Sequence, residues 1–174
     1  MQKHFPIILL LLLAFPAFSQ QKESIKIAWP EEYKWKIGSD QKTAQVDVVE
    51  LIPGKESLEK WTLMGNTMTI KGGQNIPVEA AMNMMFEQAQ KNSDNAKLTL
   101  VEKSDPNIEN PWVLFKIEAS SFHNDKNPES QLYYITSGKT ALYSNFIAVK
   151  ESKLKDKFVE KWTAVFKQTT IVTE

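Results

Sequence analysis

The sequence predicts an α+β domain in which a central antiparallel sheet of about six or more strands carries two main helices. Most of the chain alternates apolar and polar residues, as strands with one buried face do. Only two segments, 77–90 and 152–166, repeat apolar residues at helical spacing. The expected strands come in runs rather than alternating one by one with helices, which favours antiparallel pairing.

The first part of the chain predicts strands joined by short turns. Alternating apolar residues indicate strands at 25–29 and 33–37, and Gly38-Ser39-Asp40 is expected to turn the chain after the second. A longer strand is expected over 44–52, closed by the turn Pro53-Gly54-Lys55.

The middle of the chain predicts a helical turn, a strand and then the first long helix. Residues 56–61 fit one helical turn, and 62–71 fit a strand that ends at Gly72-Gly73. The helix should begin near Pro77, because proline suits the first helical position. Met84 lies off its apolar stripe, which consists of Val78, Ala81, Met82, Met85, Phe86 and Ala89.

The second half predicts five more strands and a second helix. One strand begins at Leu98. A nearly continuous apolar run at 112–117 suggests a strand covered on both faces. Residues 122–130 form a polar loop, and the strands 132–136 and 141–149 flank the hairpin turn Ser137-Gly138-Lys139-Thr140. Ser152 is the expected N-cap of the second helix, and 169–172 is expected to add a short strand.

The N-terminus predicts export. Lys3, an apolar run and the small-x-small exit Ala17-Phe18-Ser19 make residues 1–19 a cleavable signal peptide, cut after Ser19. The apolar stretch is shorter than the roughly 20 residues that span a membrane. An uncleaved anchor is the alternative. Residues 20–174 are then one domain, periplasmic or secreted, with no transmembrane segment after cleavage.

Composition excludes several classes of function. The chain has 21 basic and 21 acidic residues and no arginine, so it has no basic excess for binding nucleic acid. It has no cysteine, which rules out disulfides, thiolate zinc sites and cysteine nucleophiles. No cofactor is predicted.

Few residues are candidates for catalysis or for binding a metal or ligand. His123 and Asp125 could hold a weak metal site, but one histidine with loop carboxylates lacks dedicated zinc spacing. A solvated loop, whose Asn and Asp residues favour turns, is the preferred interpretation. Gly138-Lys139-Thr140 matches the end of a phosphate-binding loop, but position 133 is tyrosine instead of glycine and no helix follows. Dense aromatics in the strands suggest a ligand or partner surface, with core packing as the alternative; the candidates are Trp29, Trp35, Tyr133 and Tyr134.

The segment Glu56-Ser57-Leu58 followed by Trp61-Thr62, together with a closing helix bearing Phe158, Trp162 and Phe166, resembles small exported PsbP-like and DcrB-like proteins. The resemblance implies an α/β/α-type sandwich and an accessory or binding role in the cell envelope, without any functional residue set. We therefore expect a non-enzymatic exported cell-envelope protein that docks on a protein partner or a small ligand. Its oligomeric state stays open. The alternative is a carboxylate- or metal-dependent hydrolase with a site near His123.

Overall fold

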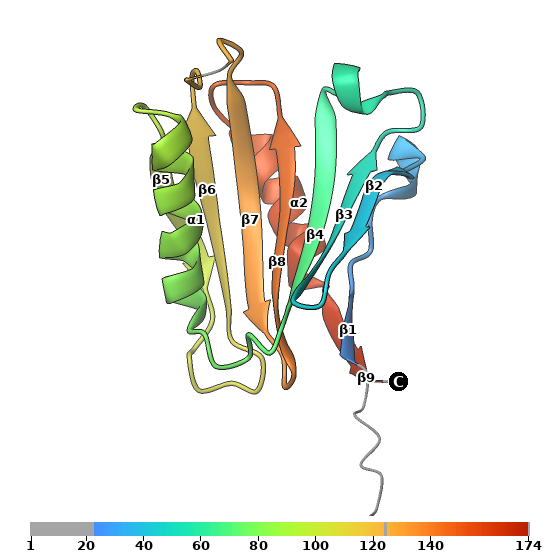
Figure 1. The fold of residues 1–174 in the computed structure, drawn as a ribbon, viewed down its shortest axis with the longest axis vertical. Coiled ribbons are helices and arrows are strands. Elements are labelled where there is room, and N and C mark those ends of the chain that lie inside the picture. The colour runs from blue at the N-terminus through green and yellow to red at the C-terminus, as the bar shows by residue number, and fades with distance from the viewer. Residues whose placement is uncertain (1–22, 124, 174) are drawn as a thin grey trace, which may run out of the picture.

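The computed structural model describes residues 23–123 and 125–173, so the expected signal peptide and its cleavage point lie outside the described residues. Within these residues, seven strands form one antiparallel sheet in the order β2-β3-β4-β8-β7-β6-β5 (Figure 1). They are β2 (Lys36–Lys42), β3 (Val46–Ile52), β4 (Leu63–Lys71), β5 (Lys97–Lys103), β6 (Trp112–Ala119), β7 (Glu129–Ser137) and β8 (Ala141–Val149). The prediction of an α+β fold with an antiparallel sheet is confirmed.

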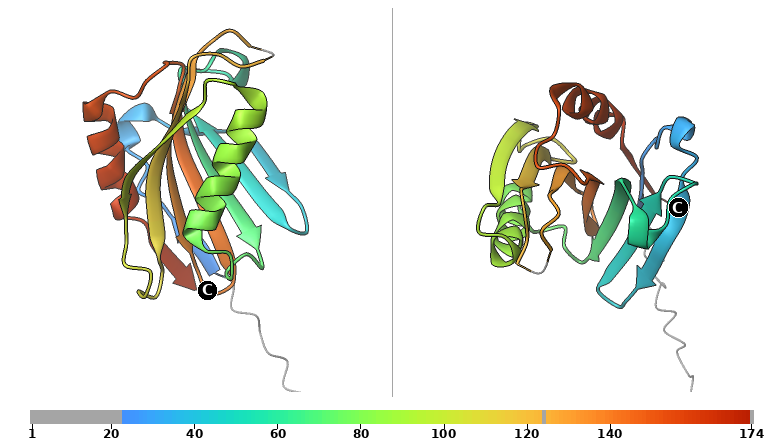
Figure 2. Two further views of the ribbon diagram at one scale, coloured as in Figure 1. Left: turned by 90° about the vertical axis from the view of Figure 1, so that its left-hand side faces the viewer. Right: turned by 90° about the horizontal axis from the view of Figure 1, so that it is seen from above.

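The remaining elements lie around this sheet. The short strands β1 (Glu23–Lys26) and β9 (Thr170–Thr173) pair with each other in a separate antiparallel ribbon. The helix α1 (Val78–Asn92) lies on one face of the sheet and α2 (Asp156–Lys167) on the opposite face (Figure 2). Two single-turn 3₁₀ helices, η1 (Glu31–Tyr33) and η2 (Leu58–Lys60), precede β2 and β4.

Alternation along the strands divides the core into two layers. On β6, Leu114 packs in the α2 layer, whereas Val113 and Phe115 pack in the α1 layer. Successive strand residues point to opposite faces, so the apolar run at the start of β6 supplies both layers at once. The prediction of a strand covered on both faces is confirmed here, although β6 lies next to the edge strand β5.

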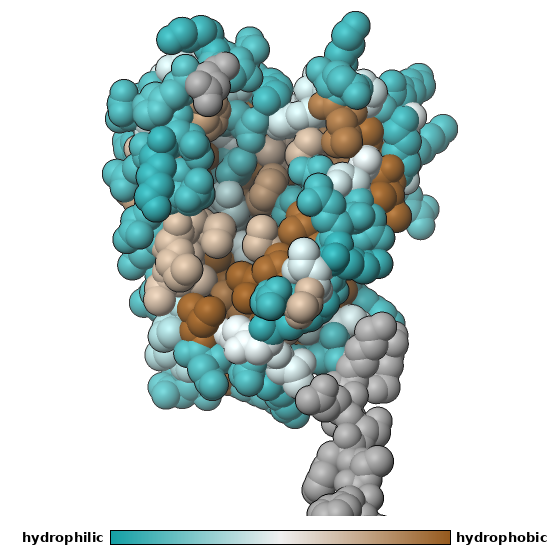
Figure 3. Space-filling model, in the orientation of Figure 1, coloured by the Kyte–Doolittle hydropathy of each residue, from teal (hydrophilic) through white to brown (hydrophobic). Residues whose placement is uncertain are grey.

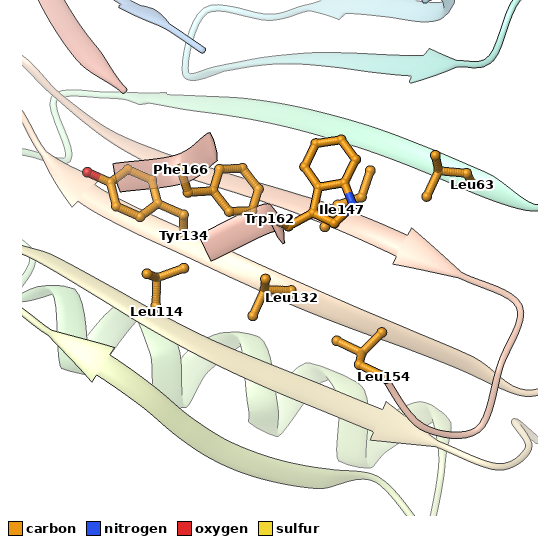
Figure 4. Close-up of a cluster of buried hydrophobic side chains, with 8 residues drawn as sticks. All are labelled: Leu63, Leu114, Leu132, Tyr134, Ile147, Leu154, Trp162 and Phe166. Atoms are coloured by element: carbon orange, nitrogen blue, oxygen red, sulfur yellow. The ribbon is translucent and has the colours of Figure 1, made fainter. Parts of the chain in front are cut away.

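The α2 layer is an aromatic core. Trp162 and Phe166 point from α2 toward the sheet, where Tyr134 stacks on Phe166 with ring centroids 5.7 Å apart (Figure 4). Trp29 lies against Trp162 from the chain before β2, at 5.9 Å. A Cβ on Gly65 would come within 2.8 Å of the Trp29 ring, so glycine at this position lets the indole lie close to β4.

Two predictions about the region 33–40 were wrong. Tyr33 belongs to η1 rather than to a strand, and Lys34 after it adopts a left-handed conformation with φ of 49°. The expected turn at 38–40 lies inside β2, which continues through an irregularity between Ile37 and Ser39. In both cases side-chain packing decided the outcome: Tyr33 stacks on Trp162, and Gly38 leaves room for Leu58 above the strand.

The second helix begins later than expected. Lys155 rather than Ser152 occupies the N-cap position of α2. The backbone N–H of Leu154 donates to the Glu118 carboxylate at 2.8 Å, which holds the chain before the helix against β6. This tertiary hydrogen bond involves residues 36 positions apart, so the local sequence pattern did not reveal it.

The hairpin turn between β7 and β8 binds a carboxylate of the same chain. Glu23 of β1 accepts hydrogen bonds from the backbone N–H groups of Lys139 and Thr140 at 2.9 and 3.0 Å, and from the Thr140 hydroxyl at 3.0 Å. A Cβ on Gly138 would lie 2.5 Å from the Glu23 carboxylate, so any other residue here would displace this carboxylate. The contact fastens the β1–β9 ribbon to the end of the main sheet.

Glu23→Gln is expected to destabilise the protein by about 1 kcal/mol above about pH 5, and less at lower pH. Burial alone would raise the pKa of Glu23, but the hydrogen bonds from Lys139, Thr140 and Tyr143 together lower that pKa below its usual value. A lowered folded-state pKa adds stability above the unfolded-state pKa, and this stability is lost as the pH falls through the folded-state pKa. Urea unfolding of both forms across this pH range measures the difference.

Glu31→Gln is the matched control, because the structure shows no side-chain hydrogen bond for Glu31 among the described residues. The difference in free energy of unfolding between Glu31→Gln and the wild-type protein should not change with pH. A loss of stability in Glu23→Gln that stayed constant down to pH 3 would show that the ionised Glu23 carboxylate does not supply this stability.

Candidate functional site: the open half of the α1 face

The helix α1 covers only part of its face of the sheet. It packs on β6 and β7, and within the described residues no α-helix lies over β8, β4, β3 and β2 on this side. One end of this part is covered by the segment after η2, where Trp61 packs on Ile52, Met64 and Ala148. Apolar surface extends over this uncovered part, between α1 at the left and the β2–β3 hairpin at the right (Figure 3). Since apolar surface usually faces a partner or a core, this half is the candidate site.

The register of the strands identifies the side chains on this surface. Ile70 packs in the α1 layer, so Met68, two residues earlier on β4, lies on the same face. Val46 pairs with Ile70 and Val48 with Met68, which places both valines on that face as well. These four residues are half-buried, as is Phe146 of β8. We call this set the open sheet face: Val46, Val48, Met68, Ile70 and Phe146.

Met84 is an exposed methionine on the outer side of α1. Glu79 forms an ion pair with Lys103 of β5, which fixes the side of α1 that faces the β5 edge. Met84 follows Glu79 by five residues, about 140° further round the helix, so it lies on the outer side of α1, away from the β5 edge. Its side chain is 55% exposed. Methionine is flexible and polarisable, and therefore suits a surface that adapts to a partner.

A buried amide lies among these apolar residues. Asn66 of β4 pairs with Phe146 and is only 4% exposed, yet its Oδ1 has no hydrogen-bond partner among the described residues. A buried acceptor without a partner is destabilising by about 1–3 kcal/mol. The floor of the site therefore contains one buried hydrogen-bond acceptor, the Asn66 Oδ1, without a donor.

A chain of hydrogen bonds borders the site at one end. The Tyr133 hydroxyl donates to Gln131 at 2.6 Å, Gln131 donates to Glu129 at 2.7 Å, and Lys150 donates to Glu129 at 2.8 Å. The Lys150 ammonium also lies 4.1 Å from the centroid of the Trp61 ring. Burial, together with the charge of Glu129, raises the pKa of Tyr133, so its hydroxyl remains a donor. This border is fixed and polar, in contrast with the apolar surface beside it.

The four aromatic residues proposed from the sequence do not form one site. Trp29 and Trp35 contact each other in the α2 layer, with centroids 5.5 Å apart, and Tyr134 packs in the same layer. Tyr133 points to the opposite face, where it lies between Phe115 and Phe146. Of the four, Tyr133 alone adjoins the open sheet face.

The two candidate metal ligands have separate partners. His123 Nε2 lies 3.2 Å from the Asp94 carboxylate, and both side chains are exposed. Asp125 accepts two hydrogen bonds from Asn127, from its backbone N–H at 2.9 Å and from its side-chain amide at 2.8 Å. In residues 23–123 and 125–173, no group of three His, Cys, Asp or Glu side chains could hold a metal ion.

Two further observations concern the chain as a whole. Among the described residues, no helix is long and apolar enough to cross a membrane. Comparison with known proteins finds no family model that matches the chain and no matching curated protein.

Proposed function

We propose that this chain is a non-enzymatic binding protein of the cell envelope, and that its open sheet face receives an amphipathic helix of a partner protein. The observation that carries the proposal is the half-exposed apolar surface beside α1, where the sheet has no α-helix of its own among the described residues. A helix bound there would lie next to α1 and complete the second half of that layer.

The dimensions of the surface favour a helix as the occupant. The strands β8, β4, β3 and β2 span about 14 Å at the usual spacing of 4.8 Å. A helix with its side chains is about 10 Å wide, so one helix fits beside α1. An extended peptide would leave its backbone groups unpaired on a sheet face. Helices dock in such places through apolar residues at three- and four-residue spacing.

A small ligand fits the open sheet face less well. Two cavities of about 610 and 450 Å³ both lie on the α2 side of the sheet. Small-molecule sites are usually concave and enclose most of the ligand. The open sheet face is broad and shallow by comparison, as protein-binding surfaces are.

We also propose that the chain is a PsbP-like or DcrB-like exported protein with the α/β/α-type sandwich of that class. Two features support this. The helices lie on opposite faces of an antiparallel sheet, as in that class. The Glu56–Thr62 segment folds as a unit, because the Glu56 carboxylate accepts hydrogen bonds from the backbone N–H and the hydroxyl of Thr62 at 2.7 and 2.5 Å.

Photo-crosslinking in cells of the native source tests the docking surface. A photoreactive residue at Val48 should crosslink to a partner segment with an amphipathic helical pattern. The same residue at Ile37 is the control, since Ile37 is 63% exposed and pairs with Leu51, which points to the other face. A synthetic peptide of that segment should then bind Val48→Lys at least about tenfold more weakly than wild type or Ile37→Lys.

A circular-dichroism melt shows whether each lysine variant is folded before binding is measured. Three results would overturn helix docking: equal crosslinking at both positions, crosslinking only to a second copy of this chain, or a peptide that binds Val48→Lys as tightly as wild type.

A further inference from the structure

One charged side chain lies among the residues of β3, β4 and β8 that face the α1 side. Glu50 follows Val48 by two residues on β3, so both lie on the same face of the sheet. Glu50 pairs with Asn66 of β4 and with Ser39 of β2, which places it in the row of residues next to Val48. Its side chain is half-buried. A carboxylate therefore lies directly beside the apolar residues on which a helix would dock.

The Glu50 carboxylate has no partner of its own. Among the described residues, no ion pair and no hydrogen bond reaches it. The lysines at the ends of β4 and β8 are engaged elsewhere, because Lys71 lies 2.7 Å from Asp47 and Lys150 lies 2.8 Å from Glu129. The open sheet face thus contains an acidic group whose charge nothing in the described part of the chain compensates.

Lys36 is the remaining lysine on this face of the four strands from β2 to β8. It is exposed and pairs across the strands with Ile52 rather than with Glu50. Leu58 of η2 lies over Gly38, where an added Cβ would come within 2.9 Å of it, and so occupies the space above β2 just after Lys36. Lys36 stays in solvent at the end of the strand.

A helix that covered Glu50 with apolar side chains alone would bind poorly. Removal of a carboxylate from water is strongly unfavourable unless a cation or a hydrogen-bond donor replaces the lost water. A lysine or arginine of the partner would supply a charge-assisted hydrogen bond, which is shorter and stronger than a neutral one. An acidic residue at the same place would be repelled. The surface therefore distinguishes between helices whose apolar stripes are alike.

The spacing of the strand residues locates this cation on the partner. Glu50 lies two residues, about 7 Å, beyond Val48 along β3. A helix aligned with α1 would run nearly along the strands (Figure 1), and its residues four apart lie about 6 Å apart along the axis. The residue one turn beyond the contact with Val48 therefore reaches Glu50. Past Glu50 the face is closed, because Trp61 packs on Ile52 and Met64.

We propose that the helix received by the open sheet face is basic, and that it carries a lysine or arginine, one turn beyond its contact with Val48, that pairs with Glu50. This inference rests on the proposed helix docking and names the chemistry of the partner. Glu50 selects among amphipathic helices, whereas Val48, Met68 and Phe146 provide the apolar contact.

Selection from a displayed peptide library on residues 20–174 tests the proposal. The probes are peptides of about 15 residues with leucine fixed at helical spacing, and with lysine, arginine, glutamate, glutamine or alanine at the positions that flank this stripe. Peptides retained by the wild-type protein should carry lysine or arginine at least about fivefold more often than glutamate at one flanking position. The preference should fall below about twofold on Glu50→Gln, which keeps the shape of the side chain and removes its charge.

Glu87→Gln is the matched control, because Glu87 is exposed on α1 and its substitution changes the net charge equally. This variant should keep the preference for basic peptides. A circular-dichroism melt shows that each variant is folded. Persistence of the preference on Glu50→Gln, or its loss on Glu87→Gln, would overturn the pairing with Glu50.

Val48→Lys separates this inference from helix docking itself. Peptides retained by the wild-type protein but not by Val48→Lys, with no preference for lysine or arginine, would leave helix docking in place and overturn the pairing. Equal retention of the library by the wild-type protein and Val48→Lys would overturn both.

Discussion

Replacing Trp162 with alanine is expected to lower the free energy of unfolding by about 3–5 kcal/mol. The Trp162 side chain is fully buried and lies at the centre of the α2 layer. Its ring centroid lies within 6.2 Å of those of Trp29, Tyr33 and Trp35, all three from the chain before β2. Removal of the ring would leave a cavity that joins α2, the sheet and this N-terminal segment.

Chemical denaturation followed by far-UV circular dichroism measures this loss of stability. Two further variants serve as a conservative substitution and as a surface control. Trp162→Phe should be the milder change, because it keeps an aromatic ring and removes an indole N–H that has no hydrogen-bond partner among the described residues. Ile37→Ala should change stability by less than about 0.5 kcal/mol, since Ile37 is mostly exposed. A Trp162→Ala loss below about 1 kcal/mol would show that the three N-terminal aromatic residues pack without it.

The sequence predicted the elements whose pattern is local. Strands β3, β4, β7 and β8 each have their own apolar pattern bounded by turn residues, and α1 follows Pro77 with apolar residues at helical spacing. The segment around Tyr33 and Trp35 shows strand-like alternation as well, but its aromatic rings pack on α2 instead of on a neighbouring strand. Contacts with a helix more than 120 residues away decided that conformation, and no local pattern contains them.

The candidate site was missed for a related reason. Which half of a face α1 covers depends on the strand order, and β8 lies between β4 and β7 although it comes last in the sheet's sequence order. A single sequence does not reveal that insertion. Tyr133 and Tyr134 are consecutive in a strand, so they point to opposite faces and belong to different surfaces. Apolar residues at Val46, Val48, Met68 and Ile70 were the available signal for the open sheet face.

Glu118→Ala is expected to be the second strongest destabilising change, by about 3 kcal/mol. Glu118 is 8% exposed, and its carboxylate accepts the Leu154 N–H at 2.8 Å and the Lys116 ammonium at 3.2 Å. Alanine would leave a buried backbone N–H without an acceptor and a half-buried lysine without its counter-charge. Since Leu154 is 5% exposed, water could not readily replace the lost acceptor.

Glu118→Gln separates the two contributions, because the amide oxygen can still accept from Leu154 while the ion pair with Lys116 is lost. Its deficit, from the same denaturation experiment, should be about 1 kcal/mol, and hydrogen exchange at the Leu154 amide should stay slow in this variant but become fast in Glu118→Ala. Equal deficits in both variants would assign the effect to the charge pair rather than to the Leu154 contact. The predicted difference follows from where α2 begins: the chain before it is held by this hydrogen bond across the sheet, in place of the cap that Ser152 was expected to provide.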